Sequence, residues 1–418
     1  MVDDWSDSRE TLDHWRWHAL ASCVFHSIIN QIMFFDFASI PHLTKLTFQI
    51  DDAEVKWLYT ISLIAAIPTI FCIMALLDTY KVAVALVGVG GTAIASLLRL
   101  VAAHQASFTL AILSSVALGV GYGKVLVDFT AITKTWFASS PKEHAMATAI
   151  VVQGSFFGWA LGGVIVPVVH TQSGLIRLCI VQAICASLCW LIHLPFNWAP
   201  SVDEERPSEP TEHTALKYVA GQSTIGIGKS LTLMLCNSSF LMLLVGGGLC
   251  QGIAFAVPAI SAEALLSNGV RLHTTAWANF GFIMSGVIVG LIIGRSGVVG
   301  KKILILNLSW VLMGALVGLQ LVASSKGMGQ SERDPIMILL MLASGASSLG
   351  SVNAVVERIC EVALPIPETH AGGTMEVLGL VLASFLTQWS VGQEFKVLAG
   401  ASICAAVATS VGLFLKRP

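Results

Sequence analysis

The amino-acid sequence predicts an all-α membrane protein with twelve transmembrane helices in two halves of six. Two observations lead to this prediction. Apolar residues make up 55% of the 418 residues and charged residues only 11%, whereas about a quarter of the residues in a soluble domain are charged. The apolar residues also gather in segments near or above the roughly 20 residues that a helix needs to cross a bilayer, and the chain has room for about a dozen crossings.

Six apolar segments come before the most polar stretch of the chain, and six come after it. The first six cover residues 18–44, 57–77, 82–103, 107–131, 145–169 and 174–195. Residues 196–228 carry the densest Pro, Ser, Glu and Asp content, which is typical of a solvated linker. The second six cover residues 232–262, 274–294, 301–323, 336–357, 366–388 and 395–415. We therefore expect two six-helix halves, residues 1–195 and 229–418, joined by the linker 196–228.

The distribution of Lys and Arg predicts the orientation of these segments, because cytoplasmic loops carry an excess of both residues. With a cytoplasmic N-terminus, the cytoplasmic side receives fourteen of them: Arg9, Arg16, Lys81, Lys134, Lys142, Arg206, Lys217, Lys229, Arg295, Lys301, Lys302, Arg358, Lys416 and Arg417. The opposite side receives seven: Lys45, Lys56, Arg177, Arg271, Lys326, Arg333 and Lys396. This excess favours cytoplasmic termini and a cytoplasmic linker, with the plasma membrane as the expected location.

Several functional classes are disfavoured by the same composition. Lys and Arg are spread thinly over the loops, so no basic face for nucleic acid is present. The nine cysteines lie in or beside apolar runs without a CxxC pair, which indicates packing residues rather than metal ligands. The first 17 residues are acidic and aromatic, unlike a cleaved signal peptide. No Walker loop, HExxH or GxSxG motif appears, so we expect no enzyme activity and no cofactor.

Six spans, a charged linker and six spans is the layout of the major facilitator superfamily, whose halves rock about a site near the bilayer midplane. Glycines inside the spans, such as Gly154, Gly158 and Gly162, let helices approach closely. The alternative is a receptor or scaffold without a transported ligand. Such proteins usually carry an extra soluble domain, and no stretch outside the predicted spans exceeds about 35 residues.

Three longer blocks carry a more specific resemblance. They are DDAEVKWLYTISLIAAIPTIFCIMALLD (51–78), TWFASSPKEHAMATAIVVQGSFFGWALGGVIVP (135–167) and ERICEVALPIPETHAGG (357–373). Their Trp57, Pro68, Glu361 and Glu368 stand where one family has the same residues. The blocks together resemble the feline leukaemia virus subgroup C receptor family of facilitators. That family includes choline and ethanolamine transporters, proteins proposed to move haem, and members linked to pyridoxine.

This resemblance implies a central cavity with an aromatic cage for a quaternary ammonium, which ring faces attract because it cannot be hydrogen-bonded. The family's cage tryptophan falls at Phe34, and its tyrosine falls at Phe255. A glutamine of the family falls near Phe157, with Gln153 one turn away, and a further site position falls near Glu376.

Four ionisable residues inside the predicted spans are functional candidates, because a charge in the bilayer is costly without water, a partner or a ligand. Lys124 and Asp128 lie four residues apart, so they share a helical face and can pair with each other. Alternatively, Lys124 points into the cavity and holds an anionic group. Glu376 has no obvious local partner and is a candidate for balancing a cation or binding a proton.

The fourth residue, Asp36, lies about 200° around the helix from Phe34, whereas Asn30 and Phe34 share a face with His26. If Phe34 faces the ligand, Asp36 turns to a neighbouring span and pairs with Lys124 or Arg99. If the helix is kinked before Pro41, both side chains reach the site. We expect His26 to be a hydrogen-bonded packing residue.

The leading hypothesis is a monomeric carrier in the lipid bilayer that moves a small organic metabolite, a cation such as choline or ethanolamine, by alternating access. The expected substrate-binding residues are Phe34, Asn30, Gln153, Phe157, Gln251, Phe255, Asn353 and Glu376, with Asp36, Lys124 and Asp128 as ion-pair or coupling residues. One alternative is transport of haem, for which His26 and Cys250 are conceivable axial ligands. Another is proton-coupled transport that depends on Asp36 or Glu376.

Overall fold

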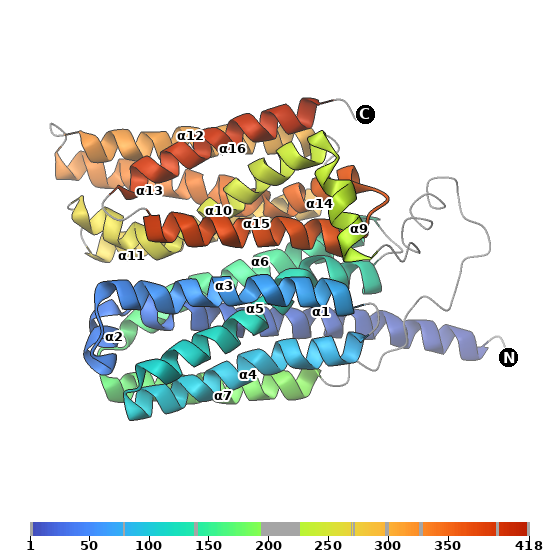
Figure 1. The fold of residues 1–418 in the computed structure, drawn as a ribbon, viewed down its shortest axis with the longest axis horizontal. Helices are drawn as coiled ribbons and strands as arrows, with labels where there is room; N and C mark the ends of the chain where they lie inside the picture. Colours follow the sequence, from blue (N-terminus) through green and yellow to red (C-terminus); the bar gives the residue numbers. More distant parts are fainter. Residues whose placement is uncertain are drawn as a thin grey trace.

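The computed structural model describes residues 3–77, 80–137, 141–193, 226–268, 270, 272–296, 301–325, 329–389 and 393–415. Every regular element within these ranges is a helix (Figure 1). Within these ranges, twelve helical segments are long and apolar enough to cross a membrane. The prediction of an all-α protein with twelve membrane-spanning helices is therefore confirmed.

The helices fall in two runs on either side of residues 194–225. The first run contains α1 (Asp3–Ala38), α2 (Pro41–Phe48), α3 (Asp52–Leu76), α4 (Lys81–Gln105), α5 (Phe108–Trp136), α6 (Pro141–Ile165), η1 (Val166–Val168) and α7 (Gln172–His193). The second run contains α9 (Ile227–Leu235), α10 (Ser238–Ser267), α11 (Leu272–Ser296), α12 (Lys301–Ser324), α13 (Gln330–Ser348), η4 (Leu349–Ser351), α14 (Val352–Ala363), α15 (Glu368–Trp389) and α16 (Glu394–Phe414). The expected linker lies outside the described residues except for 226–228.

Local sequence signals set several helix starts. Asp51 caps α3 by accepting from the Glu54 backbone N–H at 2.8 Å, and the Glu54 carboxylate accepts from the Asp51 N–H at 3.0 Å. These two bonds form a capping box, which satisfies amide groups that have no partner inside the helix. Pro41 stands in the first turn of α2, where a missing N–H carries no penalty. It separates α2 from α1.

Three predicted spans differ from the observed helices. The first, 18–44, runs across the break between α1, which ends at Ala38, and α2, which begins at Pro41. The seventh was expected to be continuous from residue 232, but α9 ends at Leu235 and α10 begins at Ser238. Asn237 causes this break: its side chain accepts from the Phe240 N–H at 3.0 Å and donates to the Val362 carbonyl. The tenth span is longer than predicted and consists of α13, the 3₁₀ turn η4 and α14.

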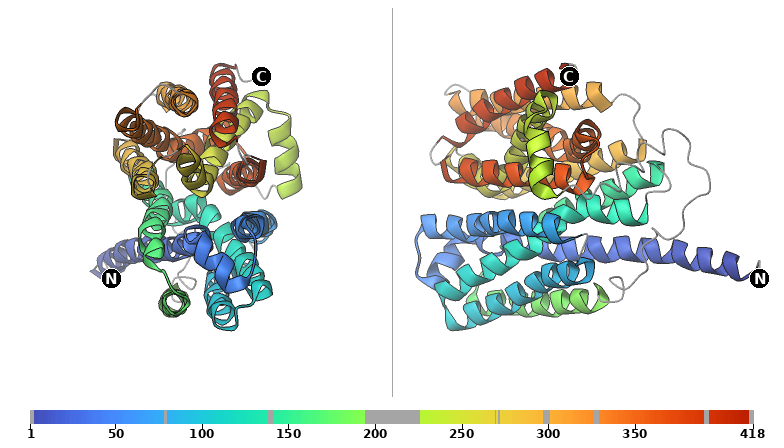
Figure 2. Two further views of the ribbon diagram at one scale, coloured as in Figure 1. Left: turned by 90° about the vertical axis from the view of Figure 1, so that its left-hand side faces the viewer. Right: turned by 45° about the vertical axis from the view of Figure 1, so that its right-hand side comes forward.

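The helices pack in two groups, shown one above the other in Figure 1 and nearly end-on in Figure 2. In the first group, α4 packs on α5 and α7, α3 packs on α5, and α1 packs on α6. In the second, α10 packs on α15 and α16, and α13 packs on α11 and α12. The groups meet along two helix pairs, α3 with α15 and α6 with α11. Of the twelve spans, α1 and α10 are the most buried, so their side chains lie in the middle of the molecule.

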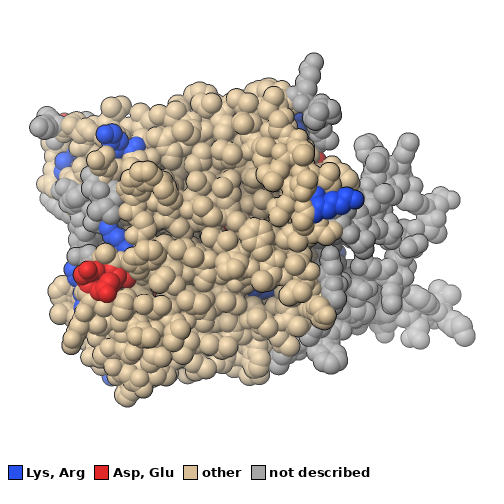
Figure 3. Space-filling model, viewed as in Figure 1, with Lys and Arg blue, Asp and Glu red and all other residues tan. Residues whose placement is uncertain are grey.

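The start of α1 and the end of α16 lie at the same end of the helix bundle, on the right in Figure 1. We call this end the terminus side and the opposite end the far side. Figure 3 shows that Lys, Arg, Asp and Glu gather toward these two ends on the face in view, and that the broad band between them is almost entirely uncharged. An uncharged band between two charged ends is what a bilayer-spanning surface requires.

Glycines form the seam between α1 and α6, as the i, i+4, i+8 spacing predicts. A Cβ added at Gly158 would lie 2.7 Å from the Ile28 carbonyl oxygen, and one at Gly154 would lie 2.7 Å from a Val24 methyl group. Only the missing side chains allow the two helices to come this close. This contact holds α6 against α1 in the centre of the bundle.

Candidate substrate site between the two halves

Six aromatic rings meet where the two groups of helices face each other. We call them the aromatic cluster: Phe34 from α1, Tyr59 from α3, Tyr122 from α5, Phe156 and Trp159 from α6, and Phe255 from α10. All six are buried. The Phe34 ring lies 4.7 Å from that of Tyr122 and 5.8 Å from that of Tyr59, measured between ring centroids.

Phe255 joins the second group of helices to this cluster. Its ring centroid lies 5.2 Å from Trp159, 6.2 Å from Tyr122 and 6.3 Å from Phe156. The Tyr59 hydroxyl also donates a 2.9 Å hydrogen bond to the Phe255 carbonyl. These tilted and edge-to-face contacts are the geometry that aromatic pairs prefer. The two groups are therefore in direct contact through Phe255, a ring that was expected to hold a ligand, and through rings that were not.

Gln31 of α1 orients the rings of the first group. Its side-chain oxygen accepts from the Trp159 indole N–H, and its amide nitrogen donates to the Ser155 hydroxyl at 2.9 Å. The Tyr122 hydroxyl also interacts with the Gln31 side chain. A buried indole or phenol needs such a partner for its polar atom. Gln31 thus fixes two of the six rings in one arrangement.

Glu376 of α15 lies beside this cluster, within electrostatic range of Tyr122. Its side chain is 2% exposed, and the Gln251 side chain of α10 donates to its Oε2 atom. No ion pair of Glu376 is present among the residues that the structure describes. Burying an unpaired charge is expensive, so this carboxyl group is the part of the site where a cation would be most stabilised.

Gln153 of α6 links the two groups of helices through its amide nitrogen. It donates to the Asn353 side chain at 3.2 Å and to the Leu349 carbonyl at 3.3 Å, and Asn353 donates to the Gly290 carbonyl at 3.0 Å. Leu349 belongs to η4, and a 3₁₀ stretch inside a spanning segment often marks a functional hinge. Gln153 and Asn353, which the sequence places on different halves, therefore meet at the interface.

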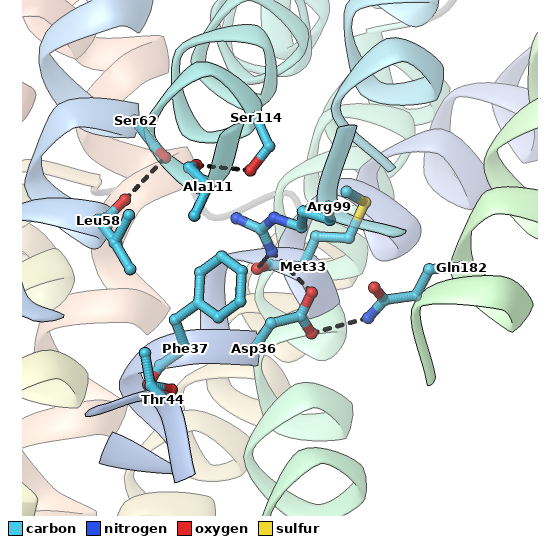
Figure 4. A network of polar contacts seen from close by, with 10 residues as sticks. All are labelled: Met33, Asp36, Phe37, Thr44, Leu58, Ser62, Arg99, Ala111, Ser114 and Gln182. Atoms are coloured by element: carbon cyan, nitrogen blue, oxygen red, sulfur yellow. Dashed lines mark hydrogen bonds and ion pairs between the residues drawn. The ribbon is translucent and has the colours of Figure 1, made fainter. Parts of the chain in front are cut away.

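Asp36 points into the first group of helices, where Figure 4 shows its carboxylate between Arg99 and Gln182. Its carboxylate accepts from Arg99 of α4 and from Gln182 of α7, both at 2.7 Å. Arg99 also donates to the Met33 carbonyl, and its guanidinium carbon lies 4.7 Å from the centre of the Phe37 ring. Of the two expectations for Asp36, the structure shows the one in which Asp36 pairs with Arg99 of a neighbouring span.

Lys124 and Asp128 pair with each other on α5, and the Cys23 thiol lies 3.5 Å from the same carboxylate. Lys124 stands two residues from Tyr122, about 200° around the helix, and packs against Gly88 of α4. This cation is therefore committed to an internal pair, and the structure does not show the alternative in which it points into the site.

The sequence of residues 20–372 matches the family model of the Major Facilitator Superfamily. The chain belongs to this superfamily. The choline/ethanolamine transporter FLVCR1 of Felis catus is 22% identical to this facilitator. The match covers 58% of this chain and 44% of the relative. The choline/ethanolamine transporter flvcr2a of Danio rerio is 25% identical over 67% of the chain and 60% of the relative. The chain spans about half the length of the curated relatives it matches, and the resemblance seen in its sequence is confirmed at low identity.

Solved structures agree with this assignment. The outward conformation of FucP, a Major Facilitator Superfamily transporter, superimposes on this facilitator with a TM-score of 0.68, covering 96% of this chain and 99% of that one at 13% identity. A bacterial homologue of the iron transporter ferroportin gives a TM-score of 0.66 at 13% identity and covers 95% of this chain and 98% of that one. At such identities the similarity shows the shared fold.

Two residues expected in the site of this facilitator lie elsewhere. Phe157 is 37% exposed; it stands about 200° around α6 from Trp159, so it points outward when Trp159 points inward. Asn30 is buried but donates to Thr92 of α4 at 2.9 Å and to the Leu118 carbonyl at 3.3 Å. It therefore joins helices within the first group. In this structure neither side chain lies against the aromatic cluster: Phe157 is on the outer face of α6, and Asn30 faces α4 and α5.

Tyr59, Tyr122, Trp159 and Gln31 were not among the expected site residues of this facilitator. One signal was available: the sequence has only four tyrosines, and Tyr122 lies deep inside a predicted span, away from the interfacial belts where this residue is common. The convergence of the rings on Phe255 depends on helices that are far apart in the sequence. His26 is a hydrogen-bonded packing residue, as expected, because its Nε2 atom bonds Thr92 at 2.9 Å.

Proposed function

We propose that this facilitator carries a small organic cation, such as choline or ethanolamine, by alternating access of its two six-helix halves. The observation that carries the proposal is the aromatic cluster, built by both groups of helices, beside the Glu376 carboxyl group. Ring faces attract a desolvated cation with about 2 kcal/mol or more. A cation would also balance a carboxylate that has no other described counter-charge.

The other buried charges support a cationic substrate rather than an anionic one. Arg99 is paired with Asp36, and Lys124 is paired with Asp128, both within the first group of helices. Neither cation is therefore directed toward the aromatic cluster. An anion placed there would meet the negative faces of the rings and the Glu376 carboxylate, which both repel it.

The similar proteins support the choice of substrate. Those from Felis catus and Danio rerio are both named choline/ethanolamine transporters. Both amines are small cations, the class of ligand that aromatic rings beside a carboxyl group attract. We therefore propose them as the first substrates to test.

Residues 1–195 and 229–418 are the halves that would move, with the linker 196–228 and both termini in the cytoplasm. The described ends of α1 and α16 lie on one side of the bundle, and the expected excess of Lys and Arg falls on that side. The proposed location is the plasma membrane, and the proposed unit is a monomer, because both halves of the site come from one chain.

Haem is a weaker candidate. One suggested axial ligand, His26, bonds Thr92 inside the first group of helices. The other, Cys250, stands one residue before Gln251 on α10, about 100° around the helix from it. No observation places two axial ligands on one side of the aromatic cluster.

Uptake of labelled choline and labelled ethanolamine by proteoliposomes that contain the full chain tests the proposal. We expect saturable uptake, and an increase in KM of about tenfold for Phe255→Leu, because tenfold corresponds to about 1.4 kcal/mol and the variant loses one ring. Phe157→Leu, on the outer face of α6, is the matched control and should leave KM unchanged.

Repeating the assay with and without a pH gradient separates facilitative from proton-coupled transport. Absence of uptake of both amines, or an unchanged KM in Phe255→Leu, contradicts the proposal.

A further inference from the structure

The polar groups beside the aromatic cluster present hydrogen-bond acceptors that have no donor. The Oε1 atoms of Gln153, Gln251 and Glu376 are buried, and none of them receives a hydrogen bond in the part of the chain that the structure describes. Their side chains are no more than 2% exposed. An unpaired buried acceptor loses its hydrogen bonds to water without replacement. Three of them together therefore point to a ligand that supplies the missing donors.

Each amide nitrogen in this group already donates to a protein acceptor. The Gln153 amide nitrogen bonds Asn353 and Leu349, the Asn353 nitrogen bonds Gly290, and the Gln251 nitrogen bonds Glu376. In the cluster itself, the Trp159 indole donates to Gln31 and the Tyr59 hydroxyl donates to a carbonyl. The polar side of the site therefore offers three acceptor oxygens without a donor, beside one remaining N–H each on Gln251 and Asn353.

These acceptors lie at one depth in the bundle. Helices α6 and α10 both start at the terminus side and run toward the far side (Figure 1). Gln153 precedes Phe156 by three residues, and Gln251 precedes Phe255 by four, which is about one helical turn in each case. Because the Phe156 and Phe255 rings are in contact, the two amides stand next to the cluster on its terminus side. Glu376 accepts a hydrogen bond from Gln251 and so lies with the two amides. We call the unpaired Oε1 atoms of Gln153, Gln251 and Glu376 the acceptor layer.

We propose that the site selects an ammonium that carries N–H groups, as in a primary or secondary amine, over a quaternary ammonium. This inference rests on the proposed function, since it concerns the same site and the same class of cation. A primary ammonium has three N–H donors, which equals the number of unpaired acceptors in this group, and its carbon atoms suit contact with the rings. A quaternary ammonium carries the same charge but no donor, and it would leave the acceptor layer unpaired. Sites built for hydrogen bonding discriminate strongly against analogues that lack the donor.

A series of N-methylated amines tests this inference directly. Ethanolamine, N-methylethanolamine, N,N-dimethylethanolamine and choline share one hydroxyl group and are all cations at neutral pH, but their N–H donors fall stepwise from three to none. Dissociation constants for the purified full chain would be measured for each amine by calorimetry. We expect affinity to fall at each step, with choline bound at least about tenfold more weakly than ethanolamine.

A variant of Gln153 tests whether the preference for N–H donors depends on the acceptor layer. Gln153→Met keeps the length of the side chain but removes its unpaired oxygen, so the difference between ethanolamine and choline should shrink severalfold. Gln320→Met, at a glutamine of α12 that bonds Ser324 far from the site, is the matched control and should keep the wild-type ratio. A merely structural role for Gln153 would weaken all four amines equally.

Each outcome of these measurements decides something. Choline bound as tightly as ethanolamine, or a ratio that Gln153→Met leaves unchanged, overturns the inference while cation binding itself stands. Absence of binding for all four amines overturns the proposed function together with the inference. If Gln153→Met does not fold, the wild-type series gives the answer by itself.

Discussion

Asp36 shows how a carboxylate is accommodated inside a membrane-spanning helix. Each of its two oxygens accepts one hydrogen bond, from Arg99 and from Gln182, so both are satisfied without water. Arg99 in turn is held by a carbonyl group of α1 and by the Phe37 ring. The network links α1, α4 and α7 close to the turn of α1 that carries Phe34. It therefore supports the site without facing it.

Removing only one charge of the Asp36–Arg99 pair should destabilise the protein far more than removing both charges. Asp36→Asn leaves the Arg99 charge buried and unbalanced, and we expect a loss of about 3–5 kcal/mol of stability. The double variant Asp36→Asn with Arg99→Met removes both charges and should recover most of that loss. Thermal unfolding of the detergent-solubilised protein measures both. Arg177→Gln, at an exposed arginine on α7, should change stability by less than about 0.5 kcal/mol. Equal destabilisation in the single and double variants would contradict this account.

At this scale the sequence predicts part of the site. Helical geometry alone separates Asp36 from Phe34, and the i, i+4 spacing alone pairs Lys124 with Asp128, because both depend only on neighbours along one helix. The sequence does not predict that Phe157 is exposed, because the rotation of α6 is set by its contacts with α1 and α11. Those contacts involve helices that the sequence does not align with one another.

Among the helices, the closest contact in the second group is between α11 and α13. A Cβ added at Gly345 would lie 1.8 Å from the Phe282 carbonyl oxygen, so the two backbones touch. Ser285 of α11 also donates to the Leu342 carbonyl of α13 at 2.8 Å. Both features depend on the absence of a side chain at residue 345. The contact holds α13 and the following η4 turn against the interface.

Replacing this glycine should separate the two helices. We expect Gly345→Ala to destabilise the protein by about 1–3 kcal/mol, the usual range for overpacking, because a backbone atom cannot rotate away. Gly314→Ala on α12 is the control: its added Cβ would meet nothing within 4 Å, and alanine favours a helix by up to about 1 kcal/mol over glycine. Thermal unfolding of both variants measures these two changes in stability. A Gly345→Ala variant as stable as wild type would show that the helices are not in this contact.

Helix boundaries were predicted less well than helix number. The break between α9 and α10 follows from Asn237, whose side chain bonds both its own helix start and the end of α14. Average hydrophobicity over a whole span does not detect it, because the short polar stretch 237–239 is surrounded by longer apolar runs. The tenth span was underestimated at its two ends, where the helix includes charged residues such as Arg333 and Glu361.

Over the whole molecule, the two groups of helices touch on both sides of the aromatic cluster. On the far side, Gln388 of α15 donates to Thr60 of α3 at 2.8 Å. On the terminus side, His370 of α15 bonds the Met74 carbonyl of α3 at 3.2 Å, and a Cβ at Gly373 would lie 3.2 Å from the Met74 Cγ atom. Alternating access would require each of these contacts to open in turn.

Locking the terminus side should therefore stop transport. In a chain whose nine cysteines are replaced by alanine, Met74→Cys and Gly373→Cys together place two thiols across the α3–α15 contact. We expect oxidation to abolish at least about 90% of amine uptake by proteoliposomes, and a reductant to restore it, because a disulfide tolerates little separation of its Cα atoms. Each single cysteine variant should be insensitive to the oxidant. Full uptake by the cross-linked chain would contradict movement at this contact.

The sequence by itself determined the membrane class and the twelve membrane-spanning helices of the described residues. In lipid, every backbone polar group must be satisfied within its own segment, so local hydrophobicity and length are sufficient for these features. Only the tertiary structure decided which rings converge on Phe255, which charges pair across helices, and which acceptors beside Glu376 stay without a donor. These depend on the rotation of each helix about its axis, which packing between segments distant in the chain determines.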